Sequence, residues 1–204
     1  MKKIVPLVIT LLLYLVLSNH AISQENNNLD LTSNTALIII DIQNFYFPEG
    51  ALPLYEPEKA AENAKKVLDF YRKNKMLVIH VKHNASSGAE IHDLVKPLDG
   101  EKVVSKDKAN AFVGTDLLEF LKANNITNLT LCGMQTHMCL EAATRAASDY
   151  GFECIVIEDA CTTRDLKHGD EIVKAKDVHY STLSTLKDTY AEIETTANFV
   201  NALK

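Results

Sequence analysis

The sequence predicts one α/β domain, built as a doubly wound, Rossmann-like parallel β-sheet with helices on both faces. Short apolar runs alternate along the chain with segments of helical spacing, which is the pattern of successive strand–helix units. No internal repeat or low-complexity tract divides the chain after its first 34 residues. The length suits a single hydrophobic core.

The first predicted elements are two strands and a long helix. Residues 35–41, TALIIID, are a continuous apolar run that ends in a carboxylate, as expected of a strand buried on both faces. Residues 57–75 space their small and apolar side chains along one helical face. Residues 76–81 are a second β-rich run, and the polar residues 85–100 are expected to form a long loop.

The middle of the chain repeats this alternation. Residues 103–104 predict a short strand, and residues 115–124 have the spacing of a helix. A strand at 129–134 leads into a helix over 136–150, which ends at Gly151, a residue typical of helix termini.

The last predicted elements are a strand at 154–158, a helix within 170–187, a strand at 191–195 and a helix at 197–204. Strands separated by helices in this way pair in parallel. In such sheets ligands bind beyond the carboxyl ends of the strands. The residues at and after the strand ends are therefore the candidates for a functional site.

Residues 1–23 are predicted to be a signal peptide. Two lysines precede a 14-residue apolar run, and residues 21–23, Ala-Ile-Ser, offer small side chains for cleavage. The run is shorter than the roughly 18 residues that a membrane span needs. We therefore expect an exported protein, periplasmic or secreted, with no stable membrane insertion after cleavage; an uncleaved N-terminal anchor is the alternative. Residues 24–34 are a polar leader, and residues 35–204 form the domain.

Composition narrows the class of partner. The formal charge is −6, and removal of residues 1–23, with two lysines and no acids, makes it −8, which disfavours nucleic acid. The seven glycines form neither a G-x-G-x-x-G nor a Walker loop. We expect a small-molecule substrate and no cofactor. Because a core of this size needs no cross-links, free thiols are expected at Cys132, Cys139, Cys154 and Cys161.

Three chemically active residues lie at predicted strand ends, and so on one rim of the sheet: Asp41, Lys106 and Cys139. A thiolate attacks carbonyl carbon, and the N-terminus of a helix favours the anion. Backbone N–H groups there can also hold an oxyanion. Asp41, kept ionised by Lys106, would accept the thiol proton.

Each of these residues also has a structural interpretation. Cys139 is equally compatible with an inert core thiol, and Asp41 with Lys106 could form an ion pair of purely structural value. Lys108, two residues further on, competes with Lys106 for the role of the cation.

The chain resembles the isochorismatase-like cysteine hydrolases, which include nicotinamidases, N-carbamoylsarcosine amidase and ureidoacrylate amidohydrolases. The resemblance extends from about residue 35 to about residue 195. It rests on the stretches LIIIDIQNFYFPEGAL, VVSKDKANAFVGTDLLEFL and LCGMQTHMCLEAATRAASDYGFECIVIEDACTTRDLKHG.

The resemblance implies the isochorismatase-like hydrolase fold and an aspartate–lysine–cysteine triad, which falls on Asp41, Lys106 and Cys139 and makes Lys108 a bystander. It also implies a cis peptide bond at Met134–Gln135. This bond would aim the Gln135 N–H, with that of Cys139, into an oxyanion hole. A homo-oligomer, either dimer or tetramer, is a further implication of the family.

Other residues near these motifs are expected to contact substrate. They are Gln43, Phe47, His83, Phe112 and His137. Three of them also have a structural interpretation without substrate contact: Phe47 and Phe112 could pack in the core, and His137 could face solvent in the first turn of its helix. Arg164 and Asp165 lie beyond the fifth strand on the same rim and are candidates for an oligomer interface.

The histidines do not reproduce the metal site of nicotinamidases. Those enzymes carry an Asp-x-His and a following His, whereas this chain has His80-x-x-His83 and then His92-Asp93. We therefore expect no metal, and nicotinamide becomes a less favoured substrate. His80 lies inside a predicted strand and is expected to be a satisfied core histidine.

The sequence thus predicts a hydrolase that cleaves an amide, carbamoyl or lactam C–N bond in a small molecule, through a thioester on Cys139. True isochorismatases cleave a vinyl ether without this cysteine, so vinyl ether or another non-amidase hydrolysis is one alternative. A non-catalytic redox or binding protein, in which Cys139 and Cys161 exchange disulfides, is the other.

Overall fold

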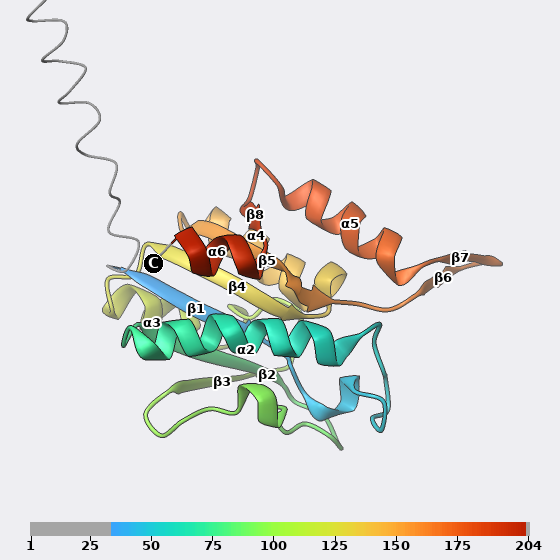
Figure 1. Cartoon of the computed structure of the whole chain (residues 1–204), viewed down its shortest axis with the longest axis horizontal. Helices are drawn as coiled ribbons and strands as arrows, with labels where there is room; N and C mark the ends of the chain where they lie inside the picture. Colours follow the sequence, from blue (N-terminus) through green and yellow to red (C-terminus); the bar gives the residue numbers. More distant parts are fainter. Residues whose placement is uncertain (1–33, 203–204) are drawn as a thin grey trace, which may run out of the picture. The chain divides into compact units, whose positions relative to one another are not determined.

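The computed structural model describes residues 34–202, so the predicted signal peptide lies outside the described residues. A six-stranded sheet of order β3-β2-β1-β4-β5-β8 forms the centre of the domain (Figure 1), and all its neighbouring strands pair in parallel. The strands are β1 (Thr35–Ile40), β2 (Leu77–His83), β3 (Lys102–Lys106), β4 (Asn128–Met134), β5 (Glu153–Thr162) and β8 (Glu192–Glu194). The predicted parallel α/β fold is confirmed.

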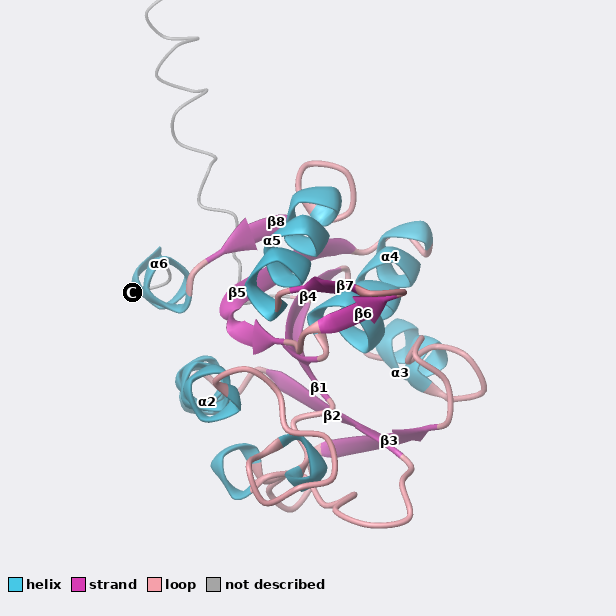
Figure 2. Cartoon of the chain, turned by 90° about the vertical axis from the view of Figure 1, so that its right-hand side faces the viewer, coloured by secondary structure: helices cyan, strands magenta, loops and turns pink. Residues whose placement is uncertain are grey.

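Helices cover both faces of the sheet. The helix α2 (Pro57–Lys73) and the helix α6 (Thr196–Ala202) lie on one face, and α3 (Leu117–Ala123) and α4 (Glu141–Asp149) lie on the other (Figure 2). The helix α5 (Ala175–Leu186) packs against α4. Within residues 34–202, no helix has the length and apolar character to cross a membrane.

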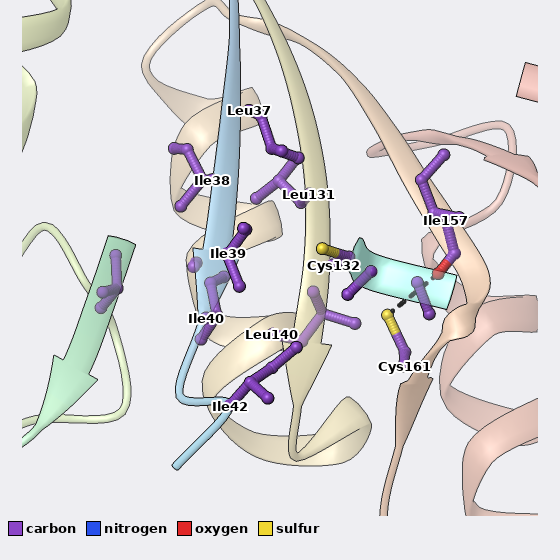
Figure 3. Packing of buried hydrophobic residues seen from close by; sticks show 14 of the residues in the cluster. Leu37, Ile38, Ile39, Ile40, Ile42, Leu131, Cys132, Leu140, Ile157 and Cys161 are labelled. Atoms are coloured by element: carbon purple, nitrogen blue, oxygen red, sulfur yellow. Dashed lines mark hydrogen bonds between the residues drawn. The ribbon is translucent and has the colours of Figure 1, made fainter. Parts of the chain in front are cut away.

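The core lies where the two central strands meet the helices. Every residue of β1 is buried, and Figure 3 shows its isoleucines beside Leu131 and Cys132 of β4. On the α2 face, the hydroxyl of Tyr71 donates to Thr130 Oγ1 at 2.7 Å, which satisfies both buried polar groups. All four cysteines are buried free thiols, as predicted.

The close approach of β1 and β4 fixes the carboxyl ends of these two strands relative to each other. Gly133, at φ +125°, allows it, because a Cβ there would lie only 2.0 Å from the carbonyl oxygen of Ile40. The residue after Ile40 is Asp41, which has the left-handed φ of 50° and ends β1. The carboxyl ends of these strands are therefore fixed side by side through backbone contact.

A small hairpin was not predicted. The strands β6 (Leu166–His168) and β7 (Glu171–Val173) pair in antiparallel and project from the rest of the domain in Figure 1. The two residues between them, Gly169 and Asp170, are a recognised hairpin signal. The flanking strands are only three residues long and mostly exposed, so they carry no periodicity that marks them in the sequence. The predicted loop over 85–100 likewise contains a short 3-10 turn, Asp93–Val95.

Candidate active site

The strand ends bring the three predicted chemical residues into contact. Lys106, the last residue of β3, donates from Nζ to Asp41 Oδ2 at 2.7 Å and to Cys139 Sγ at 3.2 Å. The side chains of Lys106 and Asp41 are fully buried, and Cys139 is 5% exposed. The lysine thus bridges the carboxylate and the sulfur in a site with little access to solvent.

His83 is a fourth member of this cluster. It is the last residue of β2 and lies opposite Lys106 in the sheet register. Its Nδ1 is 3.3 Å from Lys106 Nζ, and its charge interaction lowers the pKa of Asp41. The ring of His83 therefore contacts the lysine.

The segment that carries Cys139 differs from the predicted α-helix. Residues Thr136–Leu140 (η3) form a π-helical turn before α4, and the carbonyl of Gln135 accepts N–H groups from both Met138 (3.0 Å) and Leu140 (3.3 Å). Turns of this kind occur frequently at functional sites. The Met134–Gln135 peptide bond is cis, as the family resemblance implied.

Burial works against the ionised form of Cys139. The helix N-terminus was expected to favour a thiolate, but burial and the negative charge of Asp41 raise the pKa of Cys139 to about 12, against the opposing effect of Lys106. Burial and Asp41 therefore favour the protonated form of the thiol. Desolvation dominates because the thiol is buried more deeply than a first-turn position in a surface helix would be.

Burial also raises the pKa of Asp41, while Lys106, the thiol and His83 act in the opposite direction. Asp41 Oδ1 has no hydrogen-bond partner within the described residues. A more basic carboxylate beside a neutral thiol is an arrangement suited to proton transfer.

Tyr46 and the side chain of Gln135 lie beside the three predicted residues, and of the two only the Gln135 side chain was not identified from the sequence. Gln135 is 2% exposed, and its Nε2 donates to the Tyr46 hydroxyl at 3.2 Å. Burial raises the pKa of Tyr46 to about 12, with further increases from Asp41 and Cys139. The phenol therefore lies within electrostatic range of both.

Gln43 has a different role from the predicted substrate contact. It is fully buried, its Nε2 donates to the carbonyls of His83 (2.9 Å) and Ala89 (2.7 Å), and its Oε1 accepts from the His83 N–H at 2.7 Å. The amide therefore fastens the chain after β2 to the chain after β1. It acts as scaffold for His83.

The two predicted aromatic contacts pack against other rings. Phe47 stacks on His92, with ring centroids 3.7 Å apart. Phe112 packs against Tyr150 and Phe152, at the opposite end of α4 from Cys139. This places Phe112 in the core, consistent with its alternative interpretation.

His137 is partly buried and does not simply face solvent. Its Nδ1 hydrogen-bonds with Thr163 Oγ1 at 2.5 Å. Burial, together with the charge of Arg164, lowers its pKa, so the ring is neutral at pH 7. His137 thereby links the turn that bears Cys139 to the chain leaving β5.

The prediction of a satisfied core histidine at His80 holds for its burial and for Nε2, but Nδ1 has no hydrogen-bond partner within the described residues. His80 is fully buried, and its Nε2 lies 2.9 Å from Glu101 Oε2. Among residues 34–202, no group of three or more His, Cys, Asp and Glu side chains is arranged to hold a metal ion.

Comparison with known proteins identifies the family. Residues 35–197 match the isochorismatase domain. The isochorismatase family protein YddQ of Bacillus subtilis is 42% identical over 177 residues, which cover 81% of this chain and 98% of YddQ. Maleamate amidohydrolase of Pseudomonas putida is 28% identical, with 83% of this chain and 86% of the enzyme covered.

The fold comparison agrees. A crystal structure of an isochorismatase-type protein from Oleispira antarctica superposes with a TM-score of 0.80 at 39% identity, covering 83% of this chain and 98% of that one. The sheet order, the helices on both faces and the extent of the match all point to one conclusion: the chain is a hydrolase of the isochorismatase family.

Proposed function

We propose that this protein hydrolyses the C–N bond of a small amide through a covalent thioester on Cys139. The observation that carries the proposal is the position of Lys106 Nζ, within hydrogen-bonding distance of both Asp41 Oδ2 and Cys139 Sγ. The similarity to an enzyme named for hydrolysis of an amide, maleamate, supports it.

The first step is proton transfer from sulfur to carboxylate. Because the pKa of Cys139 is raised to about 12, the thiol needs a base, and Asp41 is the carboxylate beside it. The upward shift of the Asp41 pKa brings the base closer in proton affinity to the thiol. Lys106 stabilises the thiolate as it forms, since its ammonium already lies 3.2 Å from sulfur.

The thiolate then adds to the amide carbonyl carbon. The negative charge that develops on oxygen is held by the backbone N–H groups of Gln135 and Cys139. The protonated Asp41 gives its proton to the departing nitrogen, and the C–N bond breaks to leave ammonia or an amine and a thioester. Water, deprotonated by Asp41, attacks the thioester, which releases the carboxylic acid and restores the thiol.

The test compares the purified protein with Cys139→Ala and with Cys154→Ala. Cys154 is a matched control, because it is also a buried free thiol but lies on β5, with its Sγ directed to the Phe152 carbonyl. Release of ammonia is followed over a panel of small amides, ureides and lactams. Mass spectrometry of rapidly quenched samples reports the acyl adduct.

Activity in the native protein and in Cys154→Ala, with loss in Cys139→Ala, is the expected result. An adduct of the acyl mass that maps to the peptide containing Cys139 would establish the thioester. Equal ammonia release from all three proteins would contradict the thiol mechanism and favour hydrolysis without a covalent intermediate.

A further inference from the structure

The turn that carries Cys139 is wider than a turn of α-helix. In Thr136–Leu140 (η3), the last N–H donates to the Gln135 carbonyl, five residues earlier, at 3.3 Å. Such π-type turns are rare and occur mostly singly. Among the described residues, Gln135 makes no side-chain bond that caps the turn. The place of Cys139 Sγ, 3.2 Å from Lys106 Nζ, therefore depends on contacts that other segments make with η3.

One of these contacts joins the start of the turn to the helix α5. The side chain of Thr136 is fully buried, and its Oγ1 lies 2.9 Å from His179 Nδ1. Because a buried hydroxyl is disfavoured without a partner, this hydrogen bond holds Thr136 against His179. The bonded threonine is three residues before Cys139 in the chain.

The helix α5 is itself held against the domain. Val178 and Leu183, which lie before and after His179 in the helix, are buried. Arg145 of α4 donates to Thr185 Oγ1 at 3.3 Å, and α5 packs against both α4 and η3. His179 is therefore carried by an element that is fixed independently of the turn it contacts.

A second bond of the same kind holds the next residue of the turn. His137 Nδ1 lies 2.5 Å from Thr163 Oγ1, on the chain that leaves β5. Thr163 is fixed in turn through its carbonyl, which accepts the Tyr55 N–H at 2.8 Å. Two consecutive residues of η3 are thus hydrogen-bonded to two separate segments, which leaves the turn little freedom to rotate or shift.

The ring of His179 suits a structural bond better than proton transfer. Burial lowers the pKa of His179, which favours the neutral imidazole, and the ring packs edge-on against Tyr180 with centroids 5.4 Å apart. Within residues 34–202, His179 takes part in no ion pair. Its hydrogen bond to Thr136 is the contact through which it reaches the candidate active site.

We propose that His179 is a positioning residue for the nucleophile, which acts through the Thr136 hydroxyl to hold η3 so that Cys139 Sγ stays beside Lys106 and Asp41. This inference rests on the proposed function and adds to it a residue from α5. Catalytic groups must be held within about 0.5 Å of their productive geometry, and a displacement of about 1 Å can cost roughly 10²-fold in rate. Loss of the bond should therefore lower kcat and leave KM nearly unchanged.

The first experiment measures kcat and KM for ammonia release from the best amide of the panel. His179→Phe keeps a ring and removes Nδ1, and we expect kcat to fall by about 10- to 100-fold. His179→Asn returns a polar atom near the place of Nδ1 and should recover most of the rate. Thr182→Val is the control on the same helix, because the Thr182 hydroxyl is also buried but donates within α5, to the Val178 carbonyl at 2.9 Å. A raised KM with native kcat in His179→Phe, or no recovery in His179→Asn, overturns the inference.

A second measurement follows the thiol without turnover. The rate of Cys139 alkylation by iodoacetamide is measured by mass spectrometry of the peptide that contains it. Burial is the main cause of the raised pKa of Cys139, so release of the turn should raise the alkylation rate by about tenfold at about pH 8 for each unit by which the pKa falls. We expect this rise in His179→Phe and in Thr136→Val, no further rise when the two are combined, and the native rate in Thr182→Val.

The two measurements separate the inference from the proposed reaction. Faster alkylation in a protein that hydrolyses no amide supports the positioning role and counts against the proposed function. Cys139-dependent hydrolysis with native alkylation in His179→Phe leaves the proposed function standing and overturns the positioning role, even if kcat falls, because a general loss of stability would explain that fall.

Discussion

The ammonium of Lys106 lies 2.7 Å from the carboxylate of Asp41, and neither side chain is exposed to solvent. These two residues come from strands that are not neighbours, since β2 separates β1 from β3 in the sheet. Each charge depends on the other, because a buried ion that loses its partner keeps its desolvation penalty and loses the attraction that offsets it.

Replacing Lys106 is therefore expected to affect both stability and activity. Lys106→Met should lower the free energy of unfolding by about 3–5 kcal/mol, the usual cost of an orphaned buried charge, and abolish hydrolysis. The double variant Asp41→Asn with Lys106→Met should recover part of the stability but none of the activity. Urea denaturation and the ammonia assay measure the two effects. Lys108→Met, the neighbouring lysine, is the control, and a loss of activity there would contradict the assignment.

Asp41→Asn should separate thiol acidity from catalysis. Burial is the main cause of the high pKa of Cys139, and the charge of Asp41 adds to it. Removing this charge should lower the thiol pKa, so that the midpoint of alkylation against pH shifts downward. Hydrolysis should nevertheless fall by about 10²–10⁴-fold, because the general base is lost. Faster alkylation combined with full activity would show that Asp41 is not the base.

Gly133→Ala should be severely destabilising for a steric reason. The new Cβ would lie 2.0 Å from the Ile40 carbonyl oxygen, which is backbone and cannot turn aside. Gly151→Ala is the matched control, since Gly151 also has a positive φ, +89°, but a Cβ there meets nothing within 4 Å. We expect about 1 kcal/mol of destabilisation for the control and loss of cooperative unfolding for Gly133→Ala. Similar thermal midpoints for the two variants would contradict the close approach of β1 and β4.

The interactions of Glu101 with Arg72 and His80 should make the stability of the protein depend on pH. Burial alone would raise the pKa of Glu101, but hydrogen bonds from Arg72, the Leu98 N–H and His80 lower it to about 2. Because the pKa is lower in the folded state, the network stabilises fully above the unfolded value near 4.5, and the benefit is lost as pH falls toward 2.

Glu101→Gln tests this dependence. We expect a loss of about 2 kcal/mol at pH 7, the scale of a charged hydrogen bond, and a difference from the native protein that shrinks between pH 4.5 and 2. Chemical denaturation at several pH values measures it, with the exposed Glu119→Gln as control. A difference that stays constant with pH would contradict the role of the Glu101 charge.

Local sequence patterns predict much of the sheet and of the candidate site. The apolar run of β1 predicts both its burial and the position of Asp41 at its end, and the same reasoning places Lys106 and Cys139 on the same rim. Gly169-Asp170 contained a hairpin signal, but strands of three exposed residues give almost no periodicity to support it.

Other features depend on distant contacts that no local pattern encodes. The partners of Gln43 are backbone atoms 40 and 46 residues away, so its scaffold role is visible only in three dimensions. The raised pKa of Cys139 likewise follows from how deeply the thiol is buried.

The residues of the site fall into two groups, those on or beside the strands and those in the connecting segments. Lys106 and His83 are strand residues. Asp41 and Cys139 lie within a few residues of the ends of β1 and β4, whose close approach Gly133 allows. Tyr46 and Arg164 lie instead in connecting segments, where substitutions and insertions are tolerated more readily. Substitutions in these segments are therefore expected to change the surroundings of the site while leaving the proposed proton-transfer groups in place. The strand-borne groups and the residues of the connecting segments can therefore be substituted independently of one another.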